Sequence, residues 1–209
     1  VEMEMYGCII YNNGILASDR GHGHGVYMQN QNGVKTLRDN ILFNEFGNLL
    51  QAYGSAAAAI RNVRFEGNVV FNGRFIMGGA QPAEEITFRS NYFYRSAPQF
   101  GYDSKANRKL LIEQNYFASG LLLNWWKGVV IRDNTLYDMT PDGQTKSVSV
   151  TLAPGGTLAD YAIDGNRYFQ AYPNGNDFYI RFPQHGGGYT FSTWQQQGYD
   201  KRAHGNEQS

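Results

Sequence analysis

The chain has 209 residues, a formal net charge of zero and one cysteine. This length suits a single domain, and one cysteine excludes a disulfide framework and any site built from several cysteines. Because the charge is balanced, no basic field exists to hold a nucleic-acid backbone, and we expect no nucleic-acid partner. No run of about 18 apolar residues is present, so we expect no membrane span. Glycine, asparagine and aromatic residues are frequent, which is typical of short strands and tight turns.

The beginning of the chain leaves the first predicted coil without a cap. A strand pattern starts almost at Val1, and an uncapped coil exposes apolar side chains and strand edges. We expect this end to be covered, either by a segment that precedes Val1 or by another chain in a homo-oligomer. The first residues have neither the basic region nor the apolar core of a signal peptide.

A repeat runs along the chain in short segments that each end in asparagine. A large apolar residue stands three positions before the asparagine, and a short apolar or aromatic run follows, such as Ile41-Leu42-Phe43. The steps average about 25 residues, which is one turn of a parallel β-helix. Cys8 takes the asparagine position in an earlier, degenerate copy. The asparagines are Asn40, Asn68, Asn91, Asn115, Asn134 and Asn166.

The repeated asparagine has two predicted roles. It lies at a sharp turn between two strands, where asparagine tolerates a left-handed backbone at modest cost. Its amide can also bond to the amide of the next coil, because stacked coils lie about 4.8 Å apart. Both roles favour a stack of coils in register.

A charged residue stands two positions before each asparagine, and its sign alternates along the chain. In a strand these side chains point outward, opposite to their apolar neighbours. Neighbouring coils would then place opposite charges side by side. We therefore predict that the row controls register rather than adding much stability. The row is Arg38, Glu66, Arg89, Glu113, Arg132 and Asp164.

A third strand is predicted after each variable corner, within 25–30, 49–53, 75–78, 100–103, 121–126, 148–151 and 178–181. The sequence therefore predicts one all-β domain, a single-stranded right-handed parallel β-helix of about 7–8 coils over residues 1–188. Residues 189–209 are polar and are predicted to form a C-terminal cap, in which Trp194 packs over the last coil, and a partly disordered tail.

The repeat resembles that of the right-handed parallel β-helix proteins of the pectate-lyase-like superfamily over residues 6–170. The stretch from Gly21 to Asn30 is similar to a segment of bacterial β-helix repeat proteins of unassigned function. The resemblance implies an extracellular or cell-surface protein whose partner is a polysaccharide or oligosaccharide, acting as a lyase, hydrolase, epimerase or binding module. A non-catalytic stalk or adhesion module of a larger or oligomeric surface protein is the alternative.

Two catalytic subfamilies can be compared residue by residue. Polygalacturonase-like hydrolases carry a Gly-His-Gly motif, which Gly21-His22-Gly23 or Gly23-His24-Gly25 matches, but their Asn-Thr-Asp, Asp-Asp and Arg-Ile-Lys motifs are absent from the sequence. Calcium-dependent pectate lyases use clustered carboxylates, whereas the predicted third strands offer only Asp103 and Asp177. We therefore expect no cofactor, since calcium would need a carboxylate cluster that the sequence does not show.

The densest polar cluster is Asp19-Arg20-Gly21-His22-Gly23-His24. The candidate catalytic residues are Asp19, His22, His24 and Tyr53, which stacking would place in the next coil. A histidine would act as general acid or base on a sugar ring, with tyrosine as its partner. The two histidines could instead bind a metal, for which no third ligand is evident, or be tied to the backbone of a glycine corner. These three interpretations stay open.

An outer strip of aromatic and amide side chains is the candidate ligand surface. Flat aromatic rings stack on sugar rings, while amides bond to hydroxyl groups. The alternative is that half of these side chains face inward, because a shift of one position exchanges the two faces of a strand. The strip comprises Tyr27, Gln29, Gln51, Tyr53, Tyr102, Asn124, Trp126 and Lys127.

Overall fold

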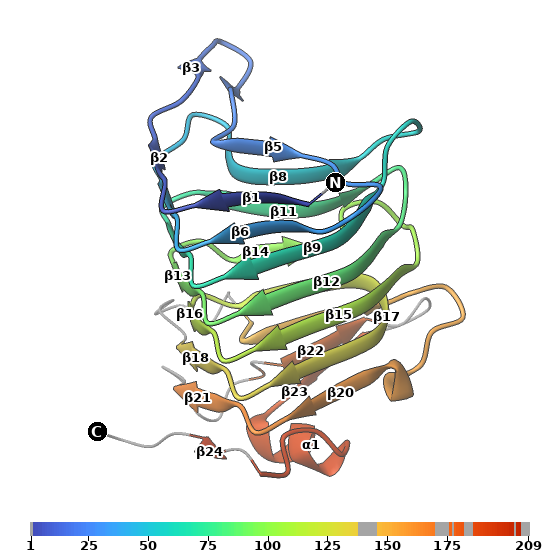
Figure 1. The fold of residues 1–209 in the computed structure, drawn as a ribbon. Coiled ribbons are helices and arrows are strands. Elements are labelled where there is room, and N and C mark those ends of the chain that lie inside the picture. The colour runs from blue at the N-terminus through green and yellow to red at the C-terminus, as the bar shows by residue number, and fades with distance from the viewer. Residues whose placement is uncertain are drawn as a thin grey trace.

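The computed structural model describes residues 2–137, 146–169, 176, 178–181, 186–202 and 204–205. The chain winds into a parallel β-helix whose coils stack along one axis (Figure 1). This confirms the all-β solenoid that the repeat predicts. The strands of successive coils form three faces.

The first face contains the strands that precede the asparagines. They are β1 (Met3–Tyr6), β6 (Lys35–Arg38), β9 (Ile60–Glu66), β12 (Ala83–Arg89), β15 (Asn107–Glu113), the end of β17 (Leu121–Arg132) and β20 (Tyr161–Asp164). The second face is a separate eight-stranded parallel sheet of the short strands that follow the asparagines. They are β2 (Ile9–Tyr11), β7 (Ile41–Phe43), β10 (Val69–Phe71), β13 (Tyr92–Tyr94), β16 (Tyr116–Ala118), β18 (Thr135–Tyr137), β21 (Arg167–Phe169) and β24 (His204–Gly205).

The third face contains β5 (Val26–Met28), β8 (Asn48–Gly54), β11 (Arg74–Gly79), β14 (Pro98–Phe100), the beginning of β17, β19 (Val148–Leu152) and β22 (Phe178–Arg181). Since β17 belongs to both the first and third faces, these two join, together with β23 (Gly186–Tyr189), into one fourteen-stranded sheet.

Two antiparallel pairs depart from the coil pattern. One is the hairpin of β3 (Ile15–Leu16) and β4 (Gly21–His22), which projects beyond the first coil (Figure 1). The other joins β22 to β23 (Gly186–Tyr189). The described helical segments are the short 3-10 turn η1 (Leu158–Asp160) and the helix α1 (Phe191–Gln196).

The core fills the interior of the coils with apolar columns in register. Leu37, Phe65 and Phe88 are paired across three strands of the first face and are at most 2 % exposed. The rings of Phe65 and Phe88 stack with their centroids 4.4 Å apart. The period of two along each strand places these residues inside and their neighbours outside.

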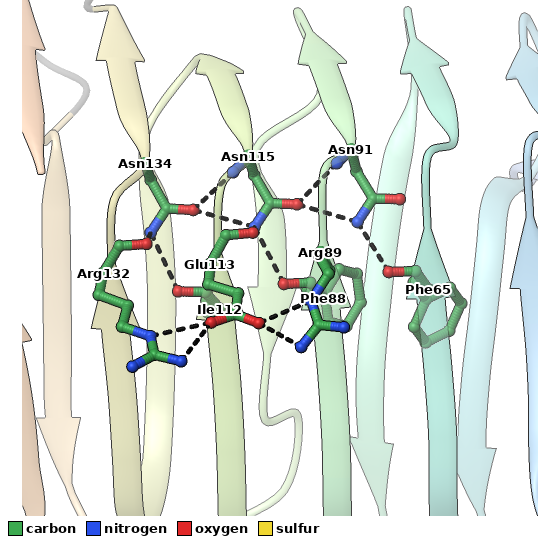
Figure 2. Close-up of polar contacts among 9 residues, drawn as sticks. All are labelled: Phe65, Phe88, Arg89, Asn91, Ile112, Glu113, Asn115, Arg132 and Asn134. Carbon is green, nitrogen blue, oxygen red and sulfur yellow. Dashed lines mark hydrogen bonds and ion pairs between the residues drawn. The ribbon is translucent and has the colours of Figure 1, made fainter.

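The asparagines form a buried ladder at the corner between the first and second faces (Figure 2). The side-chain amide of Asn91 donates to Oδ1 of Asn115 at 2.9 Å and to the carbonyl of Phe65 at 2.9 Å. The backbone N–H of Asn91 donates to the same Oδ1 at 2.8 Å. Asn115 repeats this pattern toward Asn134. Each amide thereby satisfies backbone groups that the sharp turn leaves without a strand partner.

The left-handed residue at this corner is the one before each asparagine. Asp39, Ser90 and Gln114 have φ angles of 55°, 56° and 58°, and the ladder asparagines have negative φ. The predicted amide stacking is therefore confirmed, whereas the predicted left-handed asparagine is wrong. The physical reason is that the asparagine side chain must point inward to reach the next amide, so its neighbour makes the turn.

The ladder closes on Asp200 at the C-terminal end. Its Oδ1 accepts from the amide of Asn166 at 2.9 Å, and its Oδ2 accepts from Tyr168 Oη at 2.7 Å and from Trp194 Nε1 at 2.9 Å. Burial raises the pKa of Asp200, and these hydrogen bonds oppose that rise. The Trp194 ring stacks on Phe178 at 4.8 Å and is fully buried. Helix α1 thus covers the last coil. The last residues of the predicted partly disordered tail, 206–209, lie outside the described residues.

The alternating charges are in register, but they pair only in part. Glu113 lies between two arginines (Figure 2), with Arg89 Nε at 2.6 Å and an Arg132 guanidinium nitrogen at 2.6 Å. Burial opposes ionisation of Glu113, and the hydrogen bonds from Arg132 and Arg89 outweigh it, so its pKa is lowered. At the two ends of the row, Arg38 pairs with Glu4 and Asp164 pairs with Arg202 instead.

Replacing one asparagine tests whether the buried ladder stabilises the fold. Asn115→Ala removes the acceptor of two buried N–H groups of Asn91, so we expect a loss of about 2–4 kcal/mol in the free energy of unfolding. Asn32→Ala, at an exposed loop position, is the control and should change it by less than about 0.5 kcal/mol. Equal values for the two variants in urea titrations would contradict a stabilising ladder.

Reversing one charge tests the row. Arg89→Glu places a second carboxylate beside Glu113, whose side chain is only 7 % exposed, so we expect a loss of about 1–3 kcal/mol and a lower Tm. Arg38→Glu reverses a charge in an exposed pair with Glu4 and should cost less than about 1 kcal/mol. If Arg89→Glu melts at the wild-type temperature, the row does not contribute to stacking.

Candidate functional site

A cavity of about 540 Å³ opens beside the β3–β4 hairpin, over the N-terminal part of the third face. Four coils contribute to its lining. Five of the residues predicted for the site line it, namely His22, His24, Gln51, Tyr53 and Tyr102, together with Arg20, Asn48 and Arg74. The structure therefore brings the histidine corner and the tyrosines to one place.

The glycines of the Gly-His-Gly-His-Gly motif let two coils approach closely. A Cβ on Gly47 would lie 2.0 Å from the carbonyl oxygen of Gly23, and a Cβ on Gly21 would lie 1.5 Å from that of Phe46. No side chain fits in these contacts. The histidines alternate with the glycines and line the cavity.

His24 is held as a neutral ring. Its Nδ1 accepts a hydrogen bond from the backbone N–H of Asn48 at 2.9 Å, which places the remaining ring proton on Nε2. Burial, and then the positive charge of Arg20, holds the pKa of His24 below its usual value. Of the three interpretations of the histidines, His24 therefore fits the one in which the ring is bonded to backbone. Its Nε2–H is the donor that remains for the cavity.

His22 pairs with Asp19 at the rim. Its Nε2 lies 3.0 Å and 3.2 Å from the two carboxylate oxygens. The hydrogen bond from His22 lowers the pKa of Asp19. Both side chains are well exposed, so the pair is a surface feature of the hairpin.

Tyr53 lines the cavity and is less exposed than Tyr102. Its hydroxyl lies 3.5 Å from Oδ2 of Asp103, and burial together with that carboxylate raises its pKa. The ring of Tyr102 meets Tyr53 edge-on at 5.9 Å. Gly78 makes this crossing possible, because a Cβ there would lie 2.3 Å from the backbone nitrogen of Tyr102. At neutral pH the phenol of Tyr53 is therefore protonated and acts as a donor.

In the N-terminal half of the predicted outer strip, Tyr27 and Tyr102 face outward and the amide side chains are partly buried. Tyr27 and Tyr102 are 54 % and 43 % exposed, and Tyr27 lies next to Gln51 in register. Gln29 and Gln51 are partly buried. The side chain of Gln29 donates to the carbonyl of Tyr53 at 2.9 Å, so this amide is engaged within the protein.

In the C-terminal half of the strip, the outward position predicted for Trp126 and Asn124 is wrong. Trp126 is fully buried in the core, and Asn124 is only 7 % exposed and donates to the carbonyl of Gly101. The physical reason is a shift of register between these residues, where Trp125 adopts a φ of 59° and reverses the alternation of faces. Lys127 bonds to the carbonyl of Gly155 and does not line the cavity. Asp177 lies outside the described residues.

Sequence reasoning missed Arg74 and Asn48. The two are register partners at the start of β11 and β8, and both line the cavity. Their signal is positional, since each stands one residue before a predicted third strand. Within the described residues, no group of three or more His, Cys, Asp or Glu side chains is placed to hold a metal ion. The helices of that same part of the chain are too short or too polar to cross a membrane.

The neutral state of His24 predicts a dependence of stability on pH. Because its pKa is lower in the folded chain than in the unfolded one, its contribution is complete above about pH 6.5 and is lost as the pH falls. We expect wild type to lose more unfolding free energy than His24→Gln between about pH 7.5 and pH 5.5. Asn32→Gln, at an exposed loop position without a titratable group, is the control and should retain the wild-type decline. Identical declines in wild type and His24→Gln would contradict the assignment.

Comparison with known proteins finds no similar protein. No family model matches the chain, and neither the curated proteins nor the solved structures contain a match. The fold therefore rests on the structure, and the function on the geometry of the cavity.

Proposed function

We propose that the chain is a carbohydrate-binding parallel β-helix of the pectate-lyase-like type, found at the cell surface or outside the cell. The ligand, a polysaccharide or oligosaccharide, would lie in the cavity beside the β3–β4 hairpin. The observation that supports this is the cavity itself, whose volume of about 540 Å³ is in the usual range for ligand sites.

The aromatic residues of the cavity suit sugar rings better than those of the second face. Tyr102 meets its neighbour edge-on and is 43 % exposed. On the second face, Tyr92 and Tyr116 stack in parallel at 4.7 Å with an angle of 3° between the rings. Each of those rings covers a face of the other. A sugar stacks on a free aromatic face, so the third face is favoured.

The polar groups of the cavity are mainly donors. Arg20 and Arg74 line it with the Nε2–H of His24 and the phenol of Tyr53. Hydroxyl and ring oxygens of a saccharide accept from such groups. The amide of Gln51 adds a group that can both donate and accept, although its Oε1 already accepts from Asn48 at 2.5 Å.

Binding is favoured over catalysis because two of the candidate acid–base groups, His24 and Tyr53, are not free bases. His24 accepts from the backbone, and the raised pKa of Tyr53 keeps its proton on the ring oxygen. The Asp19–His22 pair favours a second candidate, cleavage by a lyase or hydrolase. A carboxylate that orients an imidazole is the arrangement of a general base, and Tyr53 in the same cavity would then donate a proton to the leaving oxygen.

A panel of neutral and acidic polysaccharides tests the binding proposal. We expect a glycan to bind wild type, and Tyr102→Ala to weaken that binding about threefold to tenfold because one stacking ring is lost. Tyr137→Ala removes a ring of similar exposure, 44 %, from the second face and should leave binding unchanged. Binding of no glycan, or equal weakening by both variants, would overturn the proposed site.

The same panel, read for product, separates the two candidates. Cleavage would appear as new reducing ends or as absorbance of unsaturated sugars. If His22→Ala retains binding but abolishes product, the Asp19–His22 pair is catalytic. Binding without product supports the non-catalytic module.

A further inference from the structure

A hollow of about 310 Å³ lies on the outer surface of the first face, and we call it the first-face hollow. It spans β9, β12 and β15, which lie side by side in Figure 1. It shares no lining residue with the cavity of the third face. Its volume is at the lower end of the usual range for ligand sites, so a ligand that enters it is small or enters with one end.

Left-handed residues bend the three strands at the first-face hollow. Asn62, Glu85 and Lys109 have φ angles of 50°, 58° and 58°, and they occupy the same register position in β9, β12 and β15. A left-handed residue within a strand interrupts the alternation of faces and bends the strand. Two successive side chains are then exposed, as Arg108 and Lys109 are. All three left-handed residues line the hollow.

Several hydrogen-bond donors of the first-face hollow lack partners. In the described part of the chain, the side chains of Arg64, Asn62 and Thr87 make no hydrogen bond and no ion pair. The Glu85 carboxylate also lines the hollow, and it already binds Lys109 Nζ at 2.6 Å. That carboxylate is engaged by one cation, so the guanidinium of Arg64 gives the hollow an excess of positive charge.

Most arginines of the first face, in contrast, have a carboxylate partner. Arg61 lies 3.2 Å from a carboxylate oxygen of Glu84. Three arginines of the charge row pair with Glu4 or Glu113. Such pairs are expected where neighbouring strands carry opposite charges in register.

The register of β9 explains why Arg64 is unpaired. Its register partners are Thr36 and Thr87, so the neighbouring coils offer it hydroxyl groups and no carboxylate. Glu66 lies two residues further along β9, and among the described residues no ion pair joins it to Arg64. An exposed guanidinium without a counter-ion presents a planar fork of N–H donors, which matches the two oxygens of a carboxylate.

The rest of the lining is apolar. Ile86 is 1 % exposed, while Val34 and Leu111 are partly buried. An inorganic anion would leave Val34 and Leu111 in contact with water, whereas an aliphatic chain would cover them and remove apolar surface from water. An unpaired guanidinium beside an apolar wall therefore favours an organic acid.

We propose that the first-face hollow binds a small organic acid by its carboxylate. The carboxylate accepts two hydrogen bonds from the Arg64 guanidinium, and the aliphatic part lies on Val34 and Leu111. The Thr87 hydroxyl and the Asn62 amide are further donors beside it. The site lies on a different face from the cavity with His24, and the proposal does not depend on a carbohydrate ligand.

An NMR titration of the full chain at low salt with butyrate, butyramide and inorganic phosphate tests this site. We expect butyrate to bind with a Kd on the order of 1 mM and to shift the backbone amide signals of Arg64, Thr87 and Leu111. Butyramide has the same shape without the charge and should bind at least about tenfold more weakly. Phosphate lacks the aliphatic part and should also bind more weakly.

Two variants remove the proposed partner of the carboxylate. Arg64→Gln removes the charge, and Thr87→Glu places a carboxylate in register with Arg64. Both should weaken butyrate binding at least about tenfold. Arg64 is exposed and unpaired, so Arg64→Gln should retain the wild-type Tm. Arg167→Gln removes an exposed arginine from the second face and should leave binding unchanged.

Four results would overturn the proposal of the first-face hollow. They are no binding of butyrate, shifts confined to the cavity of the third face, equal binding of butyramide or phosphate, and wild-type binding by Arg64→Gln. Equal weakening by Arg64→Gln and Arg167→Gln would show a general effect of charge and would overturn it as well.

Discussion

The hydrogen bond from one asparagine amide to the next is the contact on which the rest of this fold depends. Each side-chain amide donates to the asparagine of the next coil and to a backbone carbonyl, as Asn91 does to Asn115 and Phe65. The amide must point into the core and toward the next coil, so it constrains both the position of the corner and the distance between coils. A buried amide that lost its partner would cost more than the bond itself contributes. Register is therefore specified at every coil.

Constant coil spacing turns each position of the repeat into a column. Inside, the columns are apolar and pack as Phe65 does on Phe88. Outside, they are stacked rings such as Tyr92 on Tyr116, or charges such as Arg89 beside Glu113. Because stacked rings cover one another's faces, regular columns offer little to a ligand. A binding cavity needs a place where the columns are interrupted.

The cavity lies at such an interruption. Glycines replace side chains where the histidine corner meets the next coil at Gly47, and where Tyr102 crosses Gly78 to reach Tyr53. The same part of the molecule carries the projecting β3–β4 hairpin. Irregularity is thus concentrated in the N-terminal coils, whereas the C-terminal coil is closed by Asp200 and Trp194.

The sequence by itself determined the solenoid, the strand positions, the amide ladder and the outward charges. All of these follow from a local pattern that repeats at a fixed spacing, and a repeat has only one way to stack in register. The sequence did not predict which charges form pairs along the row, because Arg38 pairs with Glu4 although Glu66 is its partner in register.

Only the tertiary structure decided which other residues join His22, His24 and Tyr53 in the cavity. His22, His24 and Tyr53 were predicted together because stacking relates them. Arg74 lines the cavity because it is the register partner of Asn48, and this pairing exists only once the coils are stacked. Trp126 is buried and not on the predicted surface, because the left-handed residue Trp125 shifts the alternation of inward and outward side chains along β17. Such a reversal depends on how the chain bends around the corner between two faces, and no periodicity in the sequence records it.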